Sequence, residues 1–265
     1  MNATFLETGG ALTQRTAMPA GRMLRAYLTE AKYESVRMLR TPAFAIPFLG
    51  LPVMLFLLFG VLLFGDALRG DPDGARFLFT AFAVLGMMGP GMFAFGMSLA
   101  IEREQGLLKL KRALPMPPAA HLIAKMLMSM LFGVIIMITM LAAAPFGHLR
   151  LTLGQALNVT LICVLGTLPF SAIGLLIGSL ATGRSGAAYV NISYQLMMHL
   201  SGLFYPLPKS MRTIAPVWPA HHLQQLVLSA VGAPSRGAAV VHLAVLASVT
   251  FLFTVLAVRR LARVG

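Results

Sequence analysis

The sequence has too little charge to cover a soluble surface. Only 11% of its 265 residues are charged, whereas 58% are hydrophobic, and the mean hydropathy is +0.81. Because a soluble domain carries about 25% charged residues, a chain this apolar is an integral membrane protein. The 8 acidic residues are outnumbered by 21 Lys and Arg. These bases lie at the ends of apolar runs, which is typical of membrane-surface anchors and argues against nucleic-acid binding.

Cysteine is almost absent, and one kind of ATP site is excluded. Cys163 is the only cysteine and lies in an apolar run, so no disulfide within the chain can form. A phosphate-binding loop of the type G-x-x-x-x-G-K-[ST] needs a Gly-Lys pair, and no lysine here follows a glycine. No metal site is expected either, because the adjacent His221 and His222 would point in different directions on a helix, with no acid nearby in sequence.

Long apolar runs are abundant, and six of them reach the length of about 20 residues that a membrane-crossing helix needs. They cover Ala43–Gly65, Phe77–Ile101, His121–Phe146, Leu153–Leu180, Gly186–Leu203 and Gly237–Val258. The sequence therefore predicts an all-α, polytopic membrane protein with six transmembrane helices in residues 42–265. With the N-terminus inside, 15 of the 21 Lys and Arg lie in cytoplasmic segments, so both termini are expected in the cytoplasm.

Prolines interrupt the region after the fifth span. They stand at positions 206, 208, 216 and 219, and they forbid one straight helix. The following stretch HHLQQLVLSAVG is too short to span. We expect re-entrant helices that dip into the outer leaflet, where irregular backbone is tolerated only beside protein or a water-filled cavity. A simple extracellular loop is the alternative.

The N-terminal region divides into two parts. Residues 1–20 are expected to be a flexible segment. Residues 21–41 combine helically spaced apolar residues with 5 bases, which predicts an amphipathic helix lying in the cytoplasmic interface. An ordinary soluble helix is the alternative interpretation, although the segment leads directly into the first span.

A charged insert, IEREQGLLKLKRALPMPPAA, separates the second and third spans at residues 101–120. Glu102 and Glu104 are expected at the head of a short helix, where carboxylates suit the positive end of the helix dipole. Leucines at 107, 108, 110 and 114 supply an apolar surface that bases surround, and Pro115 ends the helix. An apolar surface rimmed by charge predicts docking on a protein; contact with anionic lipid is the alternative.

These residues resemble the cytoplasmic signature of ABC-2-type transporter permeases. The family pattern is an acid-base-acid triplet, Gly-Thr-Leu, a proline-containing turn and a Gly-Lys pair. The matching positions are Glu102, Arg103, Glu104, Gly106, Leu108, Pro115 and Lys125. The sequence departs from the pattern at Leu107 and Ala124, which leaves the docking contacts open. The segment SGLFYPLPKSMRTIAPVWPAHHLQQLV is also similar to the family's proline-rich segment after the fifth span, so the resemblance covers about residues 21–260.

The resemblance implies the membrane subunit of an ABC exporter in the bacterial cytoplasmic (inner) membrane. Two copies of this chain would form one pathway for a hydrophobic or amphipathic substrate, such as a drug or lipid. A separate ATPase subunit, in two copies, would bind ATP and Mg, and this chain would bind no cofactor. The implied ATPase-coupling residues are Glu102, Arg103, Glu104, Gly106, Leu107, Leu108, Leu110 and Pro115. Alternatives are a polysaccharide or ion exporter of the same family, a membrane scaffold or sensor subunit, and an intramembrane hydrolase.

The fifth predicted span is the most polar. Asn191, Gln195 and His199 recur at i, i+4 and i+8, so they share one helix face. Polar residues at membrane depth usually face the bundle interior or a cavity, which predicts a lining for the export route; hydrogen bonding between helices is the alternative. The other candidate pathway residues, suited to bulky apolar cargo, are Met198, Phe204 and Tyr205. A G-x-x-x-G pair in the fourth span, Gly174 and Gly178, indicates packing within one subunit or a dimer seam.

Overall fold

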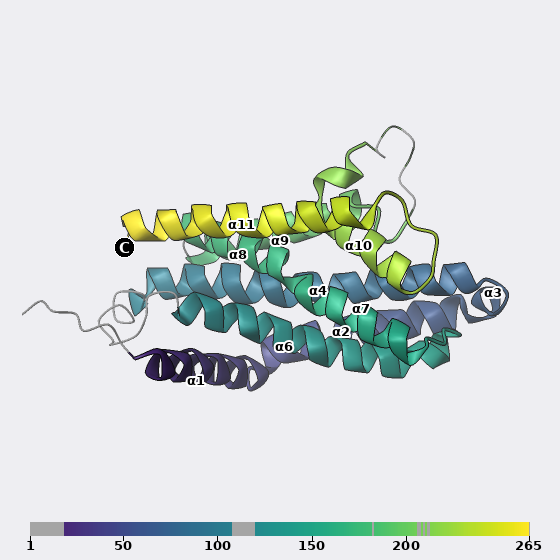
Figure 1. Cartoon of the computed structure of the whole chain (residues 1–265), viewed down its shortest axis with the longest axis horizontal. Coiled ribbons are helices and arrows are strands. Elements are labelled where there is room, and N and C mark those ends of the chain that lie inside the picture. Colours follow the sequence, from purple (N-terminus) through teal and green to yellow (C-terminus); the bar gives the residue numbers. More distant parts are fainter. Residues whose placement is uncertain are drawn as a thin grey trace, which may run out of the picture.

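The computed structural model describes residues 19–107, 120–181, 183–205, 208, 210 and 213–264. All regular elements in this part of the chain are helices, and the long ones run side by side along one axis (Figure 1). The helix α1 and the C-terminal end of α11 lie at one end of the bundle, and α3 lies at the other end (Figure 1).

The helices have the following bounds: α1 Ala20–Leu39, α2 Pro42–Leu57, η1 Leu58–Leu63, α3 Gly65–Arg69, α4 Pro72–Glu104, α6 Ala120–Ala143, η2 Ala144–Gly147, α7 Leu153–Leu165, α8 Thr167–Leu180, α9 Gly183–Leu200, η4 Ala215–Val217, α10 Pro219–Ala230 and α11 Ala239–Val264. Several of these helices begin where the local sequence favours a start. The Asp71 side chain accepts a hydrogen bond from the backbone N–H of Gly74 at 2.9 Å and caps α4. Thr152 and Gln155 form a capping box at α7.

Five helical segments in the described residues are long and apolar enough to cross a membrane. They are Pro42–Leu63, Pro72–Glu104, His121–Gly147, Leu153–Leu180 and Ala239–Arg263. They correspond to five of the six predicted spans. The predicted fifth span is also helical, as the 18-residue α9, but α9 is not in this set. Its Arg184, Asn191, Gln195 and His199 lower its hydropathy, so a sixth span stays a prediction.

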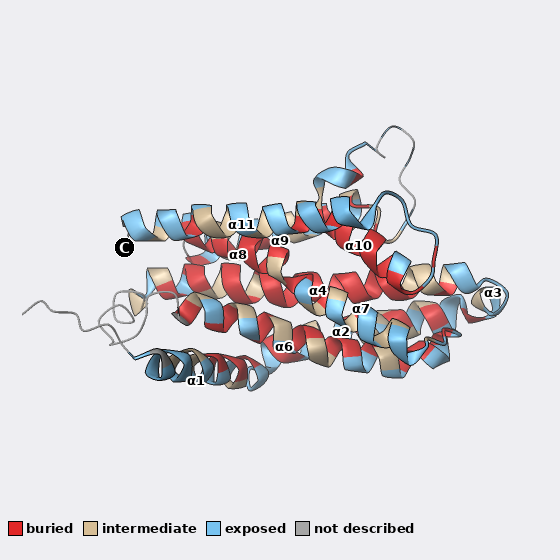
Figure 2. Cartoon of the chain, in the orientation of Figure 1, coloured by how far each residue is buried: buried red, intermediate tan, exposed pale blue. Residues whose placement is uncertain are grey.

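The helix α4 forms the centre of the bundle. In the most apolar 18-residue stretch of each span, the share of buried residues is 83% for α4, 17% for Pro42–Leu63 and 11% for Ala239–Arg263. Figure 2 shows the same contrast between α4 and the largely exposed α11. The peripheral helices therefore present apolar side chains to the surroundings, as lipid-facing helices do.

Glycines bring α4 and α8 into close contact. A Cβ atom at Gly174 would lie 2.7 Å from the backbone oxygen of Met92, and one at Gly178 would lie 2.9 Å from that of Gly96. These distances leave no room for a side chain. The G-x-x-x-G pair therefore packs within one subunit, as small residues do at membrane helix contacts, and this alternative is confirmed.

The charged insert begins differently from the prediction. Glu102 and Glu104 lie in the last turn of α4 rather than at the head of a short helix, because the helix continues without a break past Ile101. The helix stops at Gln105 and Gly106, where Gly106 adopts a φ of 72°, which favours glycine. The predicted coupling residues Leu108, Leu110 and Pro115 lie outside the described residues.

Short helices follow α9, as predicted for the proline-rich region. η4 and α10 lie there, and α10 packs against α11, α4 and α7. Ten of the twelve residues of α10 are buried, so this segment is part of the fold rather than an exposed loop. How deeply it enters the membrane stays a prediction.

Candidate functional site

The carboxylate of Glu102 is buried, and it connects three helices at one end of the bundle. Its Oε2 lies 2.8 Å from Nε2 of His121 on α6, and its Oε1 accepts a hydrogen bond from Lys125 at 3.2 Å. Arg37 of α1 donates to the same Oε1 at 3.4 Å. Only 3% of Glu102 is exposed, so within one subunit an ATPase cannot reach this carboxylate.

Lys125 completes this arrangement. Its side chain is fully buried, and it donates hydrogen bonds to Glu34 of α1 and, at 2.8 Å, to Ser98 of α4. Nδ1 of His121 lies 3.3 Å from a carboxylate oxygen of Glu30. We call the residues of this network the Glu102 cluster: Glu30, Glu34, Arg37, Glu102, His121 and Lys125. Because buried charges are stable only when they are paired, the cluster holds α1, α4 and α6 in one arrangement.

The ionisation of Glu34 reflects this pairing. Burial raises the pKa of its carboxyl, and the nearby Glu102 also raises it. The charges of Lys125 and Arg37 and the hydrogen bond from Lys125 outweigh both effects, so the pKa of Glu34 lies below its ordinary value of 4.5. Glu34 is therefore ionised at neutral pH, as its pairing with Lys125 requires.

Arg103 fastens α4 to a different helix. Its guanidinium donates three hydrogen bonds to backbone carbonyl groups at the end of α8: to Gly178 at 3.1 Å, to Ser179 at 2.6 Å and to Ala181 at 3.0 Å. The last carbonyl groups of a helix lack partners within the helix. A cation there satisfies them and also suits the negative end of the helix dipole. Arg103 therefore positions the point where α8 ends.

Glu104 reaches the start of the next helix. Its carboxylate lies so close to Gly183, the first residue of α9, that a Cβ atom on Gly183 would collide with it. A carboxylate suits the positive N-terminal end of a helix. The three successive residues thus contact four other helices: Glu102 contacts α1 and α6, Arg103 contacts the end of α8, and Glu104 contacts the start of α9. The predicted coupling residues Gly106 and Leu107 follow directly and are partly exposed.

The polar face predicted for span 5 exists, but it points away from the interior of its own bundle. Asn191, Gln195 and His199 are all exposed on α9. Asn191 and Gln195 line a cavity of about 200 Å³ together with Phe48 of α2 and Tyr194. The Nδ1 atom of His199 lies 2.8 Å from the backbone oxygen of Gln195. In a membrane-spanning helix, which α9 is predicted to be, a polar face of this kind requires a polar or protein neighbour.

The other three predicted pathway residues do not share one environment. Met198 and Phe204 are partly buried against the main apolar core, where the Phe204 ring lies 5.2 Å from that of Phe82. Tyr205 is 45% exposed. The six predicted residues therefore form no single lining within one subunit.

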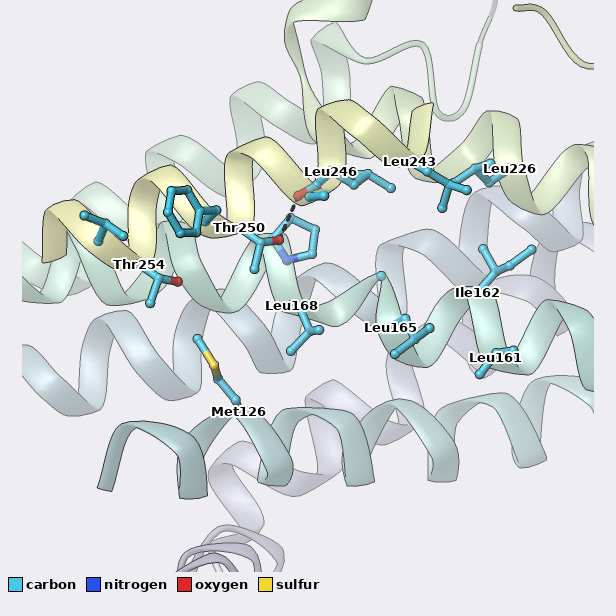
Figure 3. A pocket seen from close by; sticks show the side chains of 15 residues that line it. Met126, Leu161, Ile162, Leu165, Leu168, Leu226, Leu243, Leu246, Thr250 and Thr254 are labelled. Carbon is cyan, nitrogen blue, oxygen red and sulfur yellow. Dashed lines mark hydrogen bonds between the residues drawn. The ribbon is translucent and has the colours of Figure 1, made fainter. Parts of the chain in front are cut away.

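A larger cavity lies elsewhere in the bundle. Its volume is about 800 Å³, and it runs as an apolar groove between α7, α8 and α11, with Met126 of α6 at its edge (Figure 3). Leu161 and Leu165 of α7 face Leu243 and Leu246 of α11 across it (Figure 3). None of the six predicted pathway residues lines this groove.

Sequence reasoning missed a histidine cluster near the opposite end of the bundle. Nδ1 of His222 on α10 lies 2.8 Å from Nδ1 of His242 on α11, and the ring of His221 is 5.5 Å from that of His222. The separation of 20 residues hides this contact in the sequence. Within the described ranges, no three His, Cys, Asp or Glu side chains are grouped so that they could hold a metal ion.

The comparisons with known proteins identify the family. The family model described as "ABC-2 type transporter" matches residues 25–231, which is most of the chain. The chain belongs to this family of membrane permeases. It is also 28% identical, over 143 residues, to the protein named "Putative transport permease YvfS" from Bacillus subtilis (strain 168). That match covers 52% of this chain and 58% of the relative, so the chain spans little more than half of the relative's length.

Proposed function

We propose that this ABC-2 permease is the membrane subunit of an exporter that a separate ABC ATPase drives. The observation that supports this best is the position of the acid-base-acid triplet. Glu102, Arg103 and Glu104 end the central helix α4 and contact four other helices. A force applied to the residues that follow, beginning at Gly106, would reach α1, α6, α8 and α9 through this one triplet.

The polar face of α9 supports a homodimer. We propose that α9 is a sixth span whose Asn191, Gln195 and His199 face a second copy of the chain, because lipid cannot satisfy them. The cavity between α2 and α9 would then open toward the path between the two subunits. In this arrangement α1, the C-terminal end of α11 and the Glu102 cluster would lie on the cytoplasmic side of a bacterial membrane (Figure 1).

The same surfaces support a proposal for the substrate class. Phe48, Tyr194 and the polar side chains of α9 combine apolar area with a few hydrogen-bonding groups, which suits an amphipathic drug or lipid. A polysaccharide or ion exporter is less well supported, because the cavity offers large apolar side chains. ATP and Mg would bind on the two ATPase subunits.

The proposal is tested by co-expressing the chain with the ABC ATPase of a neighbouring reading frame. We expect the two proteins to co-purify in equal numbers and the ATPase to drive accumulation of an amphipathic fluorescent dye in inside-out vesicles. The variant Gly106→Val should lose coupling, since valine disfavours a φ of 72°. The control Gly106→Asn should keep it, because asparagine tolerates this conformation. Failure of any ATPase to associate would contradict the proposal.

A further inference from the structure

A small cavity with polar and apolar walls lies where α9 ends and α10 begins, away from the Glu102 cluster. Its volume is about 230 Å³, and its polar lining residues are Ser201, His221, Gln224, Gln225 and Arg236. They come from the end of α9, from α10 and from the loop before α11. The cavity is large enough for a small ligand group, since one water molecule occupies about 30 Å³.

The hydroxyl group of Ser201 lacks a partner among the described residues. Ser201 is fully buried, and its Oγ forms no hydrogen bond with any of them. A buried polar atom left without a partner destabilises a protein by roughly 1–3 kcal/mol, so such atoms are rare and call for an explanation. A ligand that accepts the Ser201 hydroxyl proton would remove this cost.

The charged groups that line the cavity are all cationic or able to become so. Arg236 and His221 line it, and the rings of His222 and His242 lie 5.5 Å and 6.4 Å from that of His221. No Asp or Glu in the described part of the chain forms an ion pair with any of these four residues, and α4 contributes the apolar Phe77. Arg236 therefore gives the site a permanent positive charge, and protonation of His221 adds a second one; both complement an anion.

The loop that presents Arg236 is fixed on both sides. The backbone N–H of Arg236 donates to Oε1 of Gln225 at 2.7 Å, and the backbone oxygen of Arg236 lies 2.7 Å from Nε2 of His242. His242 is held in turn by His222, whose Nε2 lies 2.8 Å from the backbone oxygen of Pro216. The wall of the cavity is therefore in place before a ligand arrives, which lowers the entropic cost of binding.

We propose that this cavity binds an anionic group, such as a carboxylate, sulfate or phosphate, through Arg236, His221 and the Ser201 hydroxyl. The anion is either free in solution or the headgroup of an acidic lipid. This site is independent of ATPase coupling and of the export route proposed above, so neither proposal fails with the other.

Binding should tighten as the pH falls. Burial and the charges of His222, His242 and Arg236 lower the pKa of His221 below its ordinary value of 6.5. The hydrogen bond with the backbone oxygen of Ser201 raises this pKa, but by less. A bound anion favours the protonated imidazole and so raises this pKa. By linkage, the anion must then bind more tightly to the protonated form, which is the majority form only below pH 6.5.

The test uses the full-length chain in neutral detergent, with sulfate as the probe, because sulfate does not titrate in this range. Calorimetric titration at constant ionic strength should give one sulfate per chain, bound more tightly at about pH 5.5 than at about pH 7.5. Arg236→Gln should weaken binding about tenfold, the effect of losing one charge-assisted hydrogen bond. The exposed Arg150 lies outside the cavity, so the control Arg150→Gln should bind like the parent.

A second variant separates binding from folding. Ser201→Ala removes the unpartnered hydroxyl, so without sulfate its thermal stability should equal or exceed that of the parent, whereas its sulfate affinity should fall several-fold. Nanodiscs then distinguish the source of the anion. If sulfate binds in nanodiscs of phosphatidylcholine but not in nanodiscs that contain phosphatidylglycerol, the site is occupied by a lipid headgroup. If sulfate binds equally in both, the natural ligand is a free anion. Absence of binding in phosphatidylcholine, or unchanged binding in Arg236→Gln and Ser201→Ala, would overturn the proposal.

Discussion

Lys125 and Glu34 form a buried ion pair that joins α6 to α1. The Lys125 side chain is fully buried and the Glu34 side chain is 5% exposed. The ion pair stands in a network with Glu102, so α1 is held to the bundle by charge as well as by apolar contact. Such a pair fixes one arrangement of the helices, because any displacement leaves a buried charge without its partner.

Replacing Lys125 should therefore destabilise the protein strongly. Lys125→Met leaves Glu34 and Glu102 buried beside an uncharged side chain, and breaking a buried pair in this way costs about 3–5 kcal/mol. We expect a lower midpoint of thermal unfolding in detergent. Lys32→Met, on the exposed side of α1, is the matched control. If Lys125→Met unfolds like the parent, the cluster does not stabilise the fold.

The same pair predicts a dependence on pH. The pKa of Glu34 lies below 4.5 in the folded chain because Lys125 and Arg37 outweigh burial and Glu102. A carboxyl group with a lowered pKa contributes stability that is complete above its ordinary value and is lost as the pH falls through its folded value. Hydrogen exchange of α1 should therefore accelerate below pH 4.5, after correction for the intrinsic rate. In Glu34→Gln this acceleration should be smaller, and an equal acceleration would contradict the assignment.

How far the sequence predicts the structure depends on the range of the interactions. The span containing α4 follows from its apolar run, which is a local property. The end of that span was predicted at Ile101, whereas α4 continues to Glu104, because the charged residues after Ile101 extend the helix instead of starting a new one. The Glu102 cluster could not be predicted, since Glu34 and Lys125 are 91 residues apart and no periodicity connects them. In the sequence, only the family pattern singles out Lys125. The direction in which the polar face of α9 points could not be predicted either. The spacing of its residues shows that they share one helix face, but it does not show which part of the molecule or its surroundings that face contacts.

Arg103 should act on α8 through geometry rather than charge alone. Arg103→Lys keeps the positive charge but replaces the planar guanidinium, whose Nη1 contacts all three carbonyl oxygens, with an ammonium group on a shorter side chain that differs in geometry. We expect this variant to fold and to bind its ATPase, while dye transport per ATP hydrolysed falls several-fold. Hydrogen exchange at residues 178–181 provides a second measurement, and it should rise in Arg103→Lys. Transport per ATP equal to that of the parent would show that the three bonds are not needed for coupling.

The contact between α4 and α8 should not tolerate a methyl group. In Gly174→Ala the new Cβ would lie 2.7 Å from the Met92 oxygen, which is backbone and cannot turn aside. Overpacking of this kind costs about 1–3 kcal/mol. Gly154 of α7 has nothing within 4 Å of such a Cβ, so Gly154→Ala should be neutral or slightly stabilising. Thermal unfolding of the two variants side by side measures the difference, and equal midpoints would contradict the close packing.

The proposed dimer contact can be tested with one introduced cysteine. The sequence has a single cysteine, Cys163, and it is fully buried, so the background of cross-linking should be low. If the polar face of α9 meets its copy across a twofold axis, Gln195→Cys should form a disulfide-linked dimer under mild oxidation in native membranes. Leu161→Cys lies in the apolar groove beside α11 and should stay monomeric. Cross-linking at Leu161→Cys but not at Gln195→Cys would move the dimer seam to the groove, and the polar face of α9 would then need another neighbour.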